Sequence, residues 1–205
     1  MGVAFPNLSA TVAFVMSALN PFLNRIVTAF LLATVILWAG GQAAQAQDVD
    51  LDVLFADLAD PQNENWEKTE DQIRALFRES GSESMNFLLE RGYAALSQGD
   101  LEVAVEHFTA LTDHAPDFAE GYNGRATTYF NLGMYGPSVS DIAKVLSLEP
   151  RHFGAIIGLA RILEDSGKPK QALEVYQQVT LIHPNQPQVA KAIARLSASV
   201  GGTNL

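Results

Sequence analysis

Three aspartates near the end of the N-terminal region have the spacing of calcium ligands. Asp48, Asp50 and Asp52, in the stretch DVDLD, match the first three ligand positions of an EF-hand loop. That loop also needs a glycine at its sixth position and an acidic residue at its twelfth, where this chain has Val53 and Ala59. The sequence therefore favours an acidic linker over a calcium site.

The four histidines do not form a metal-binding pattern. His107 and His114 are seven residues apart and can share one helix face, whereas His152 and His183 lie near predicted turns. No HExxH motif or facing carboxylate cluster accompanies them. We therefore expect surface or partly buried histidines, with no bound metal and no other cofactor.

Signatures of catalysis are also absent from the sequence. It has no Gly-x-Ser-x-Gly elbow, phosphate-binding loop or dinucleotide fingerprint. It has no cysteine either, which excludes thiolate metal sites and a cysteine nucleophile. Asp113 stands beside His114, but no nucleophile can be identified for this pair. We expect a protein without enzymatic activity.

Charge is distributed unevenly along the chain. The formal net charge is −10, but residues 48–120 carry eighteen acids against four bases, and residues 121–205 carry five acids against eight bases. A surface that binds nucleic acid would be basic. We therefore expect no nucleic-acid partner.

The N-terminal region has the pattern of an export signal. Arg25 precedes the apolar run IVTAFLLATVILWAG, which is short for a membrane span, and a small-x-small tripeptide ends at Ala46. We expect residues 1–46 to be a signal peptide that is cleaved near Ala46, with Met16 as an alternative start, so that the mature chain is periplasmic in a bacterium. The alternative is an uncleaved segment that anchors an accessory subunit in the inner membrane, which is the one membrane contact that we consider.

A period of 34 residues organises the rest of the chain. Two sets of residues that end helices recur at this spacing, namely Pro116, Pro150 and Pro184, and Gly99, Gly133 and Gly167. Proline disfavours helical geometry in the residue before it, and glycine accepts the positive φ of the turn after a helix. Each unit is therefore predicted to be a helix, a turn, a second helix and a stop.

Apolar or small residues follow the spacing i, i+4, i+7 in each helix of the repeat, which places each triplet on one stripe. The first helices carry Leu88, Gly92 and Ala95; Tyr122, Ala126 and Tyr129; and Ile156, Ala160 and Leu163. The second helices carry Ala104, Phe108 and Leu111; Ser138, Ile142 and Val145; and Ala172, Tyr176 and Val179. Asp117 with Glu120 has the pattern of a capping box, and Asp100 can cap the helix that follows it.

These features resemble the tetratricopeptide repeat family, whose helix pairs have a 34-residue period and end at a proline. The resemblance covers three units, residues 85–118, 119–152 and 153–186. It implies an all-α fold, a right-handed solenoid of helix–turn–helix units. Arg91 and Arg125 depart from it, because the family usually has leucine at both positions.

Helical segments are predicted on both sides of the repeats. Residues 47–84 contain an acidic linker and then a helical hairpin, which we expect to cap the first repeat. Residues 187–199 are predicted to form a closing helix, and residues 200–205 a tail.

The resemblance also implies a binding surface. In this family the first helix of each unit lines a concave groove, and nine residues here occupy such positions: Asn86, Leu89, Tyr93, Leu96, Asn123, Thr127, Phe130, Ile157 and Arg161. Some members bind a C-terminal carboxylate with lysine and asparagine at the positions of Leu89 and Tyr93, so that binding mode is not expected.

An apolar and aromatic groove suits an extended segment or an amphipathic helix of a protein partner, whose identity the sequence does not give. Gly124, Gly154 and Gly158 are expected to make its wall low. The sequence thus predicts a scaffold that acts through its groove. One alternative stays open, in which the N-terminal hairpin of the chain itself covers Leu89, Leu96 and Phe130.

Overall fold

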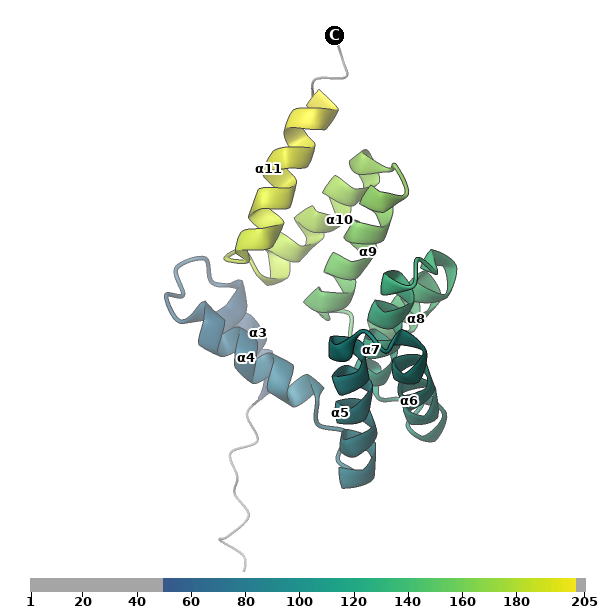
Figure 1. Ribbon diagram of the computed structural model, residues 1–205. Helices are drawn as coiled ribbons and strands as arrows, with labels where there is room; N and C mark the ends of the chain where they lie inside the picture. Colours follow the sequence, from purple (N-terminus) through teal and green to yellow (C-terminus); the bar gives the residue numbers. More distant parts are fainter. Residues whose placement is uncertain (1–49, 202–205) are drawn as a thin grey trace, which may run out of the picture. The chain divides into compact units, whose positions relative to one another are not determined.

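The structure is a computed structural model that describes residues 50–201, so the predicted signal peptide lies outside the described residues. Within this range the chain forms helices and no strands, which confirms the all-α prediction (Figure 1). The helices are α3 (Leu51–Ala59), α4 (Trp66–Phe77), α5 (Glu83–Gln98), α6 (Leu101–His114), α7 (Ala119–Asn131), α8 (Tyr135–Leu148), α9 (Phe153–Asp165), α10 (Pro169–Ile182) and α11 (Pro187–Gly201).

Three helical hairpins, α5–α6, α7–α8 and α9–α10, form the repeats and lie side by side (Figure 1). The first helix of each hairpin is followed by a glycine with positive φ, at 83° for Gly99, 70° for Gly133 and 71° for Gly167. A side chain at these positions would be strained. The period read from the glycines is therefore confirmed as a repeated turn.

The second helices supply the most deeply buried stripes. All nine residues predicted for them are buried, among them Phe108, which is fully buried. Its ring lies against Gly92 and Gly124, where a Cβ atom would overlap it. Glycine at these two positions lets α5 and α7 approach the ring closely. The expectation that Gly124 lowers the wall of the groove was therefore wrong.

Arg125, which replaces the usual leucine, links three helices. Its Nε and Nη2 atoms donate to the two carboxylate oxygens of Asp141 on α8 at 2.8 and 2.9 Å, and Nη1 donates to Thr112 of α6 at 2.9 Å. A bidentate pair of this kind satisfies most of the guanidinium donors. The departure from the family pattern is thus accommodated by polar partners on both neighbouring helices.

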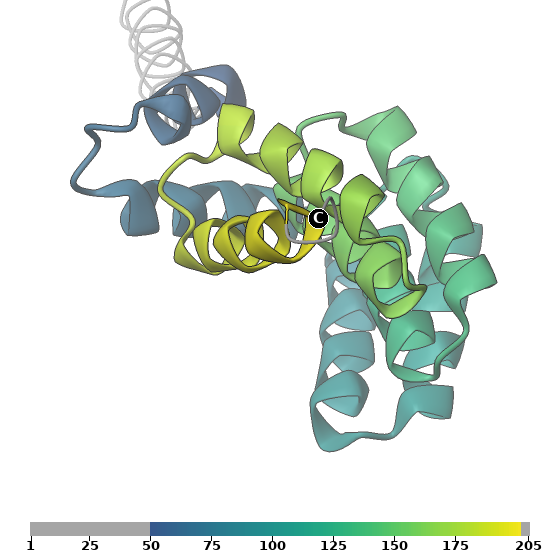
Figure 2. The ribbon, with the colours of Figure 1, turned by 90° about the horizontal axis from the view of Figure 1, so that it is seen from above.

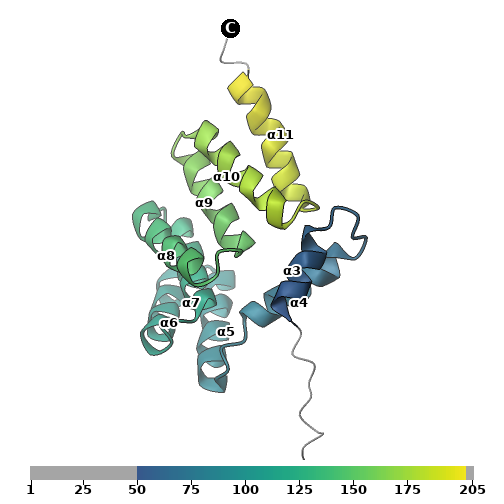
Figure 3. The ribbon, with the colours of Figure 1, turned by 180° about the vertical axis from the view of Figure 1, so that it is seen from behind.

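The N-terminal hairpin, α3–α4, does not cap the first repeat as predicted. Leu54, Phe55, Leu58 and Ile73 belong to the same buried cluster as residues of α9, α10 and α11, and Figures 2 and 3 show α3 and α4 beside α10 and the start of α11. These helices at the C-terminal end of the repeats present the apolar surface that the hairpin covers. The hairpin at the start of the described chain therefore packs against the helices at its C-terminal end.

Neither of the two predicted side-chain caps, at the starts of α6 and α7, forms in the structure. The N-cap of helix α7 is Phe118, which has no side-chain acceptor, so the capping box predicted at Asp117 and Glu120 was wrong. The Glu120 carboxylate instead accepts from Tyr93 and Asn123. Asp100 precedes α6 as predicted, but its side chain makes no capping hydrogen bond. Helix α11 starts at Pro187 and continues to Gly201, two residues beyond the predicted end.

Candidate functional site

The first helices of the repeats, with α4 and α11, line a groove made of three connected hollows. We call them the roofed cleft, of about 610 Å³, the central trough, of about 100 Å³, and the open cleft, of about 600 Å³. Asn123, Thr127 and Gly154 line both the roofed cleft and the trough. Phe130, Ile157 and Arg161 line both the trough and the open cleft, so the hollows form one path.

The central trough collects the groove residues predicted on the second and third repeats. Its lining includes Asn123, Thr127 and Phe130 of α7 and Ile157 and Arg161 of α9. Thr127 and Arg161 are exposed and the other three are half-buried. Gly154 and Gly158, which were expected to make the wall low, both line the trough.

The groove residues predicted on α5 have different places. Leu89 is 2% exposed and packs in a buried cluster with Phe108 and Leu111, and Leu96 packs against the same cluster. Asn86 accepts hydrogen bonds from the backbone N–H and the hydroxyl of Ser80 and so holds the turn before α5. Of the four residues predicted on α5, Tyr93 lines the groove and the other three do not.

The open cleft combines an apolar base with charged walls. Phe130, Ile157, Val189 and Ala192 line it together with charged residues of α9 and α11. Arg195 of α11 pairs with Glu164 at 2.6 Å, and this hydrogen bond lowers the pKa of the Glu164 carboxyl. Two further cations in its lining, Arg161 and Lys191, have no ion pair among residues 50–201. Arg161 instead lies over the Phe130 ring, 5.2 Å from its centre.

Comparison with known proteins decides the family. A tetratricopeptide repeat sequence model matches residues 62–117 and 89–136, and a second matches residues 140–196. A TPR repeat-containing protein of Rhizobium etli is 33% identical over 155 residues, which are 74% of this chain and 75% of that protein. The chain belongs to the tetratricopeptide repeat (TPR) family.

Solved TPR domains share the fold. The Sgt2 TPR domain from Aspergillus fumigatus has a TM-score of 0.56 at 18% identity and covers 60% of this chain and 83% of its own. The first TPR domain of Spaghetti (RPAP3), bound to the HSP90 peptide SRMEEVD, has a TM-score of 0.54 at 21% identity and covers 57% of this chain and 93% of its own. These similarities confirm the fold and not the ligand.

In this TPR protein, helix α4 forms a roof over one end of the groove. Phe77 stacks on His152 with 4.5 Å between ring centres and 10° between ring planes. The guanidinium of Arg74 lies 5.0 Å from the centre of the Phe153 ring, and that of Arg78 lies 4.9 Å from the centre of the Tyr93 ring. The hairpin thus lies over Tyr93, whereas the hollows lined by Phe130 include no residue of the hairpin.

A buried carboxylate–histidine contact fastens this roof. Glu70 of α4 accepts a hydrogen bond from Nε2 of His183, the residue after α10, at 3.0 Å, and another from Nε of Arg74 at 2.7 Å. Burial raises the pKa of the Glu70 carboxyl, but the hydrogen bonds from His183 and Arg74 outweigh it and hold the pKa below its usual value. We call Glu70, Arg74 and His183 the clasp.

A second carboxylate–histidine contact lies inside the roofed cleft. Glu120 accepts from the Tyr93 hydroxyl at 2.5 Å through Oε1, and from Nε2 of His152 at 3.0 Å and Nδ2 of Asn123 at 3.2 Å through Oε2. Burial first, and then the charge and hydrogen bond of Glu120, raise the pKa of the Tyr93 phenol well above its usual value. The hydroxyl therefore stays protonated and donates.

Sequence reasoning missed both contacts, because it placed His152 and His183 at the surface or only partly buried. They are 3% and 0% exposed. Both lie within two residues of a repeat proline, His152 after Pro150 and His183 before Pro184. This closeness to the turns between repeats is the one signal in the sequence that sets them apart, and it does not by itself predict burial, since His114, two residues before Pro116, is exposed.

The acidic start of the described chain has a structural use. Asp50 precedes α3 and its carboxylate accepts from the N–H of Asp52 at 3.0 Å, whereas the Asp52 carboxylate pairs with Arg151 at 2.6 Å. Across residues 50–201, no group of three or more histidine, aspartate or glutamate side chains could hold a metal ion.

Proposed function

We propose that this chain is a non-enzymatic scaffold whose groove binds a segment of a protein partner. The observation that carries the proposal is the continuous path from roofed cleft to open cleft, with an apolar base at Phe130 and Ile157 and polar groups along it. Concave surfaces of repeat proteins bind extended segments and helices in this way. TPR relatives bound to peptides support the same reading, including the RPAP3 domain with its HSP90 peptide.

The open cleft favours a partner segment that carries a carboxylate. Arg161 and Lys191 lie there without an ion pair in the described chain, beside apolar side chains of α7 and α11. A chain with a net charge of −10 repels acidic partners elsewhere. We therefore place the acidic part of the bound segment at the open cleft, next to α11.

Selection of peptides from a random display library against the full chain tests this function. Substituting Phe130→Ala together with Ile157→Ala should weaken the selected peptides by roughly tenfold or more, because apolar anchors supply most of the affinity of such interfaces. Val103→Ala with Val139→Ala is the matched control, since both valines are exposed on the second helices. Equal binding by wild type and the groove variant would contradict the proposal.

The proposed location is the bacterial periplasm, after removal of residues 1–46. It rests on the leader pattern and the lack of cysteine. Across residues 50–201, every helix is too short or too polar to cross a bilayer. The mass of the protein isolated from cells tests the proposal, because cleavage gives a chain that starts near Gln47, and an intact apolar run would favour the membrane-anchored alternative.

A further inference from the structure

The roofed cleft contains a buried carboxylate whose charge no cation of the described chain balances. Glu120 is 7% exposed, yet among residues 50–201 it has no ion pair with a lysine or arginine. Its three hydrogen-bond donors are the Tyr93 hydroxyl, the Asn123 amide and the His152 ring.

The His152 ring is neutral in this arrangement. Its Nδ1 atom accepts a hydrogen bond from the backbone N–H of Ala155 at 3.1 Å, so the ring proton is on Nε2, which donates to Glu120. All three donors to Glu120 are thus uncharged. The first turn of α7 favours a carboxylate through the helix dipole, but that amounts to about half a unit charge.

The Glu120 carboxylate, which lines the cleft, can also accept a further hydrogen bond. A carboxylate offers about four acceptor positions, and the three donors leave one. Both oxygens are already engaged, so the paired donors of a guanidinium cannot approach them side by side. A primary ammonium, which donates from a single atom, fits the remaining position.

The charged groups of α4 that face this cleft leave it negative. Arg74 is neutralised by Glu70, and Asp71 and Arg78 offset each other, so the Glu120 charge remains. Arg78 lies over the Tyr93 ring, so its positive charge competes with that of a bound ligand. At the other end of the groove, the lining of the open cleft has three cations against two acids and so a net positive charge; they are Arg161, Lys191 and Arg195, and Glu164 and Asp165.

We propose that the roofed cleft binds a primary ammonium group of the partner segment, with Glu120 as its counter-ion. The group is a lysine side chain or the amino terminus of a chain. This rests on the proposed function of the groove and gives the bound segment a direction, with its ammonium under α4 and its carboxylate beside Arg161 and Lys191.

Small ammonium probes test the site without any partner. The ¹⁵N-labelled full chain is titrated with Nα-acetyl-lysine methylamide, which carries a side-chain ammonium, and with glycine methylamide, which carries an amino-terminal one. We expect saturable shifts of the Asn123, Thr127 and Gly154 amides with one or both probes, at dissociation constants of millimolar order for ligands of this size. The probe that binds more tightly identifies the source of the ammonium.

Three variants make the result decisive. Glu120→Gln should weaken the probe at least tenfold, and Arg78→Gln should tighten it by roughly threefold, because it removes a competing cation. Asp71→Asn removes one negative charge from the cleft without touching the Glu120 network, and it should weaken the probe only slightly. Glu120→Gln is used only if its spectrum outside the cleft matches the wild type, and otherwise Arg78→Gln and Asp71→Asn decide.

Absence of saturable shifts in both wild type and Arg78→Gln would overturn the proposal. So would binding of methylguanidinium as tightly as the lysine probe. Failure here is separable from failure of the groove, because Phe130→Ala with Ile157→Ala should lose the selected peptides and still bind the ammonium probe.

Discussion

Glu70 and Glu120 each accept a hydrogen bond from Nε2 of a buried histidine, at 3.0 Å in both cases, but only Glu70 also pairs with an arginine. In the clasp, Arg74 balances the carboxylate and the contact fastens α4 to the end of α10. In the roofed cleft, the Glu120 carboxylate is held by neutral donors and faces a hollow. The same pair of side chains can therefore hold two helices together or form a site, depending on whether a cation pairs with the carboxylate.

The largest effect should come from breaking the clasp. His183→Ala removes a donor to buried Glu70 and leaves a cavity beside Trp66 and Phe153, which contact the ring. We expect the free energy of unfolding to fall by about 3 kcal/mol, the sum expected from a lost buried hydrogen bond and a new cavity.

Urea unfolding of both proteins measures this loss. His114→Ala is the matched control, because His114 is exposed at the end of α6, and it should change stability by less than about 0.5 kcal/mol. A loss below about 1 kcal/mol for His183→Ala would show that the clasp does not fasten the hairpin.

A smaller effect is expected from a change in the packing beneath Tyr93, which is one of the three donors to Glu120. Gly124→Ala would drive a Cβ atom into the ring of Phe108, on which Tyr93 packs edge-on at 5.2 Å between ring centres. The ring is fully buried and has little freedom to move, so we expect a loss of about 2 kcal/mol. Gly136→Ala in α8 meets no atom within 4 Å and should be neutral or slightly stabilising. Thermal unfolding compares the two variants, and equal melting temperatures would contradict the packing.

The smallest effect concerns pH. Because the folded-state pKa of Glu70 is held below its unfolded value of about 4.3, its contribution to stability is complete above that pH and is lost as the pH falls through the folded-state pKa. Wild type should therefore exceed Glu70→Gln in stability at pH 6, and the difference should shrink progressively below about pH 4. Urea unfolding from pH 6 to pH 3 checks this, and a difference that stays constant or grows would contradict the clasp.

Local pattern was enough to predict the repeats, and the family resemblance then gave nine groove positions, six of which line the hollows. The spacing of Gly99, Gly133 and Gly167 fixes where each first helix ends, and the helical period then places Asn123, Thr127, Phe130, Ile157 and Arg161 on one face. These positions depend only on residues near them in sequence. They therefore follow from a pattern.

Contacts between distant segments could not be predicted in this way. The clasp joins Glu70 to His183, 113 residues away, and the hairpin chooses the surface of α9 to α11 over that of the first repeat. Leu89 occupies a groove position by register, but its apolar side chain reaches the core beside Phe108 and is buried there. These contacts depend on which distant side chains are buried together or paired in the fold, and the 34-residue period carries no information on either.

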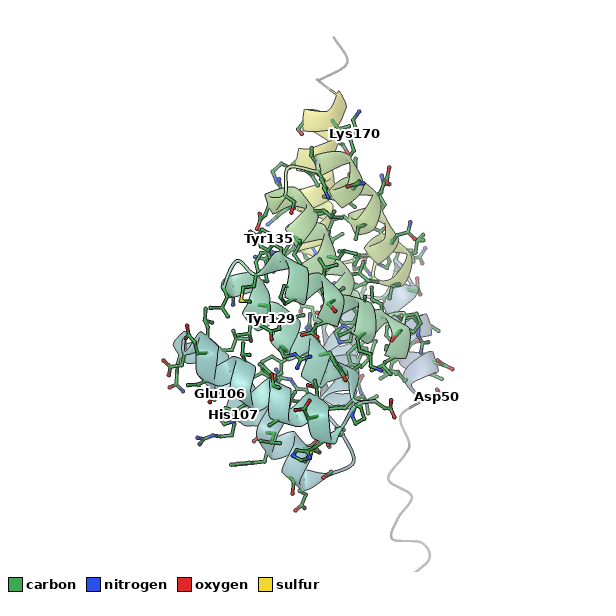
Figure 4. The ribbon with its side chains drawn as sticks, turned by 90° about the vertical axis from the view of Figure 1, so that its right-hand side faces the viewer. Asp50, Glu106, His107, Tyr129, Tyr135 and Lys170 are labelled. Atoms are coloured by element: carbon green, nitrogen blue, oxygen red, sulfur yellow. The ribbon has the colours of Figure 1, made fainter. Side chains whose placement is uncertain are left out.

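The proposed function requires that the groove is the face in contact with the partner, and site-specific photo-cross-linking can locate that face. A benzophenone side chain is placed either at Thr127, which is exposed and lines both the roofed cleft and the central trough, or at Glu106, on the exposed face of α6 (Figure 4). After irradiation of cells that express the full chain, the cross-linked species are separated and their peptides identified by mass spectrometry. We predict a discrete adduct from Thr127 that is absent from Glu106. An adduct from Glu106 alone, or the same adducts from both positions, would contradict binding of the partner in the groove.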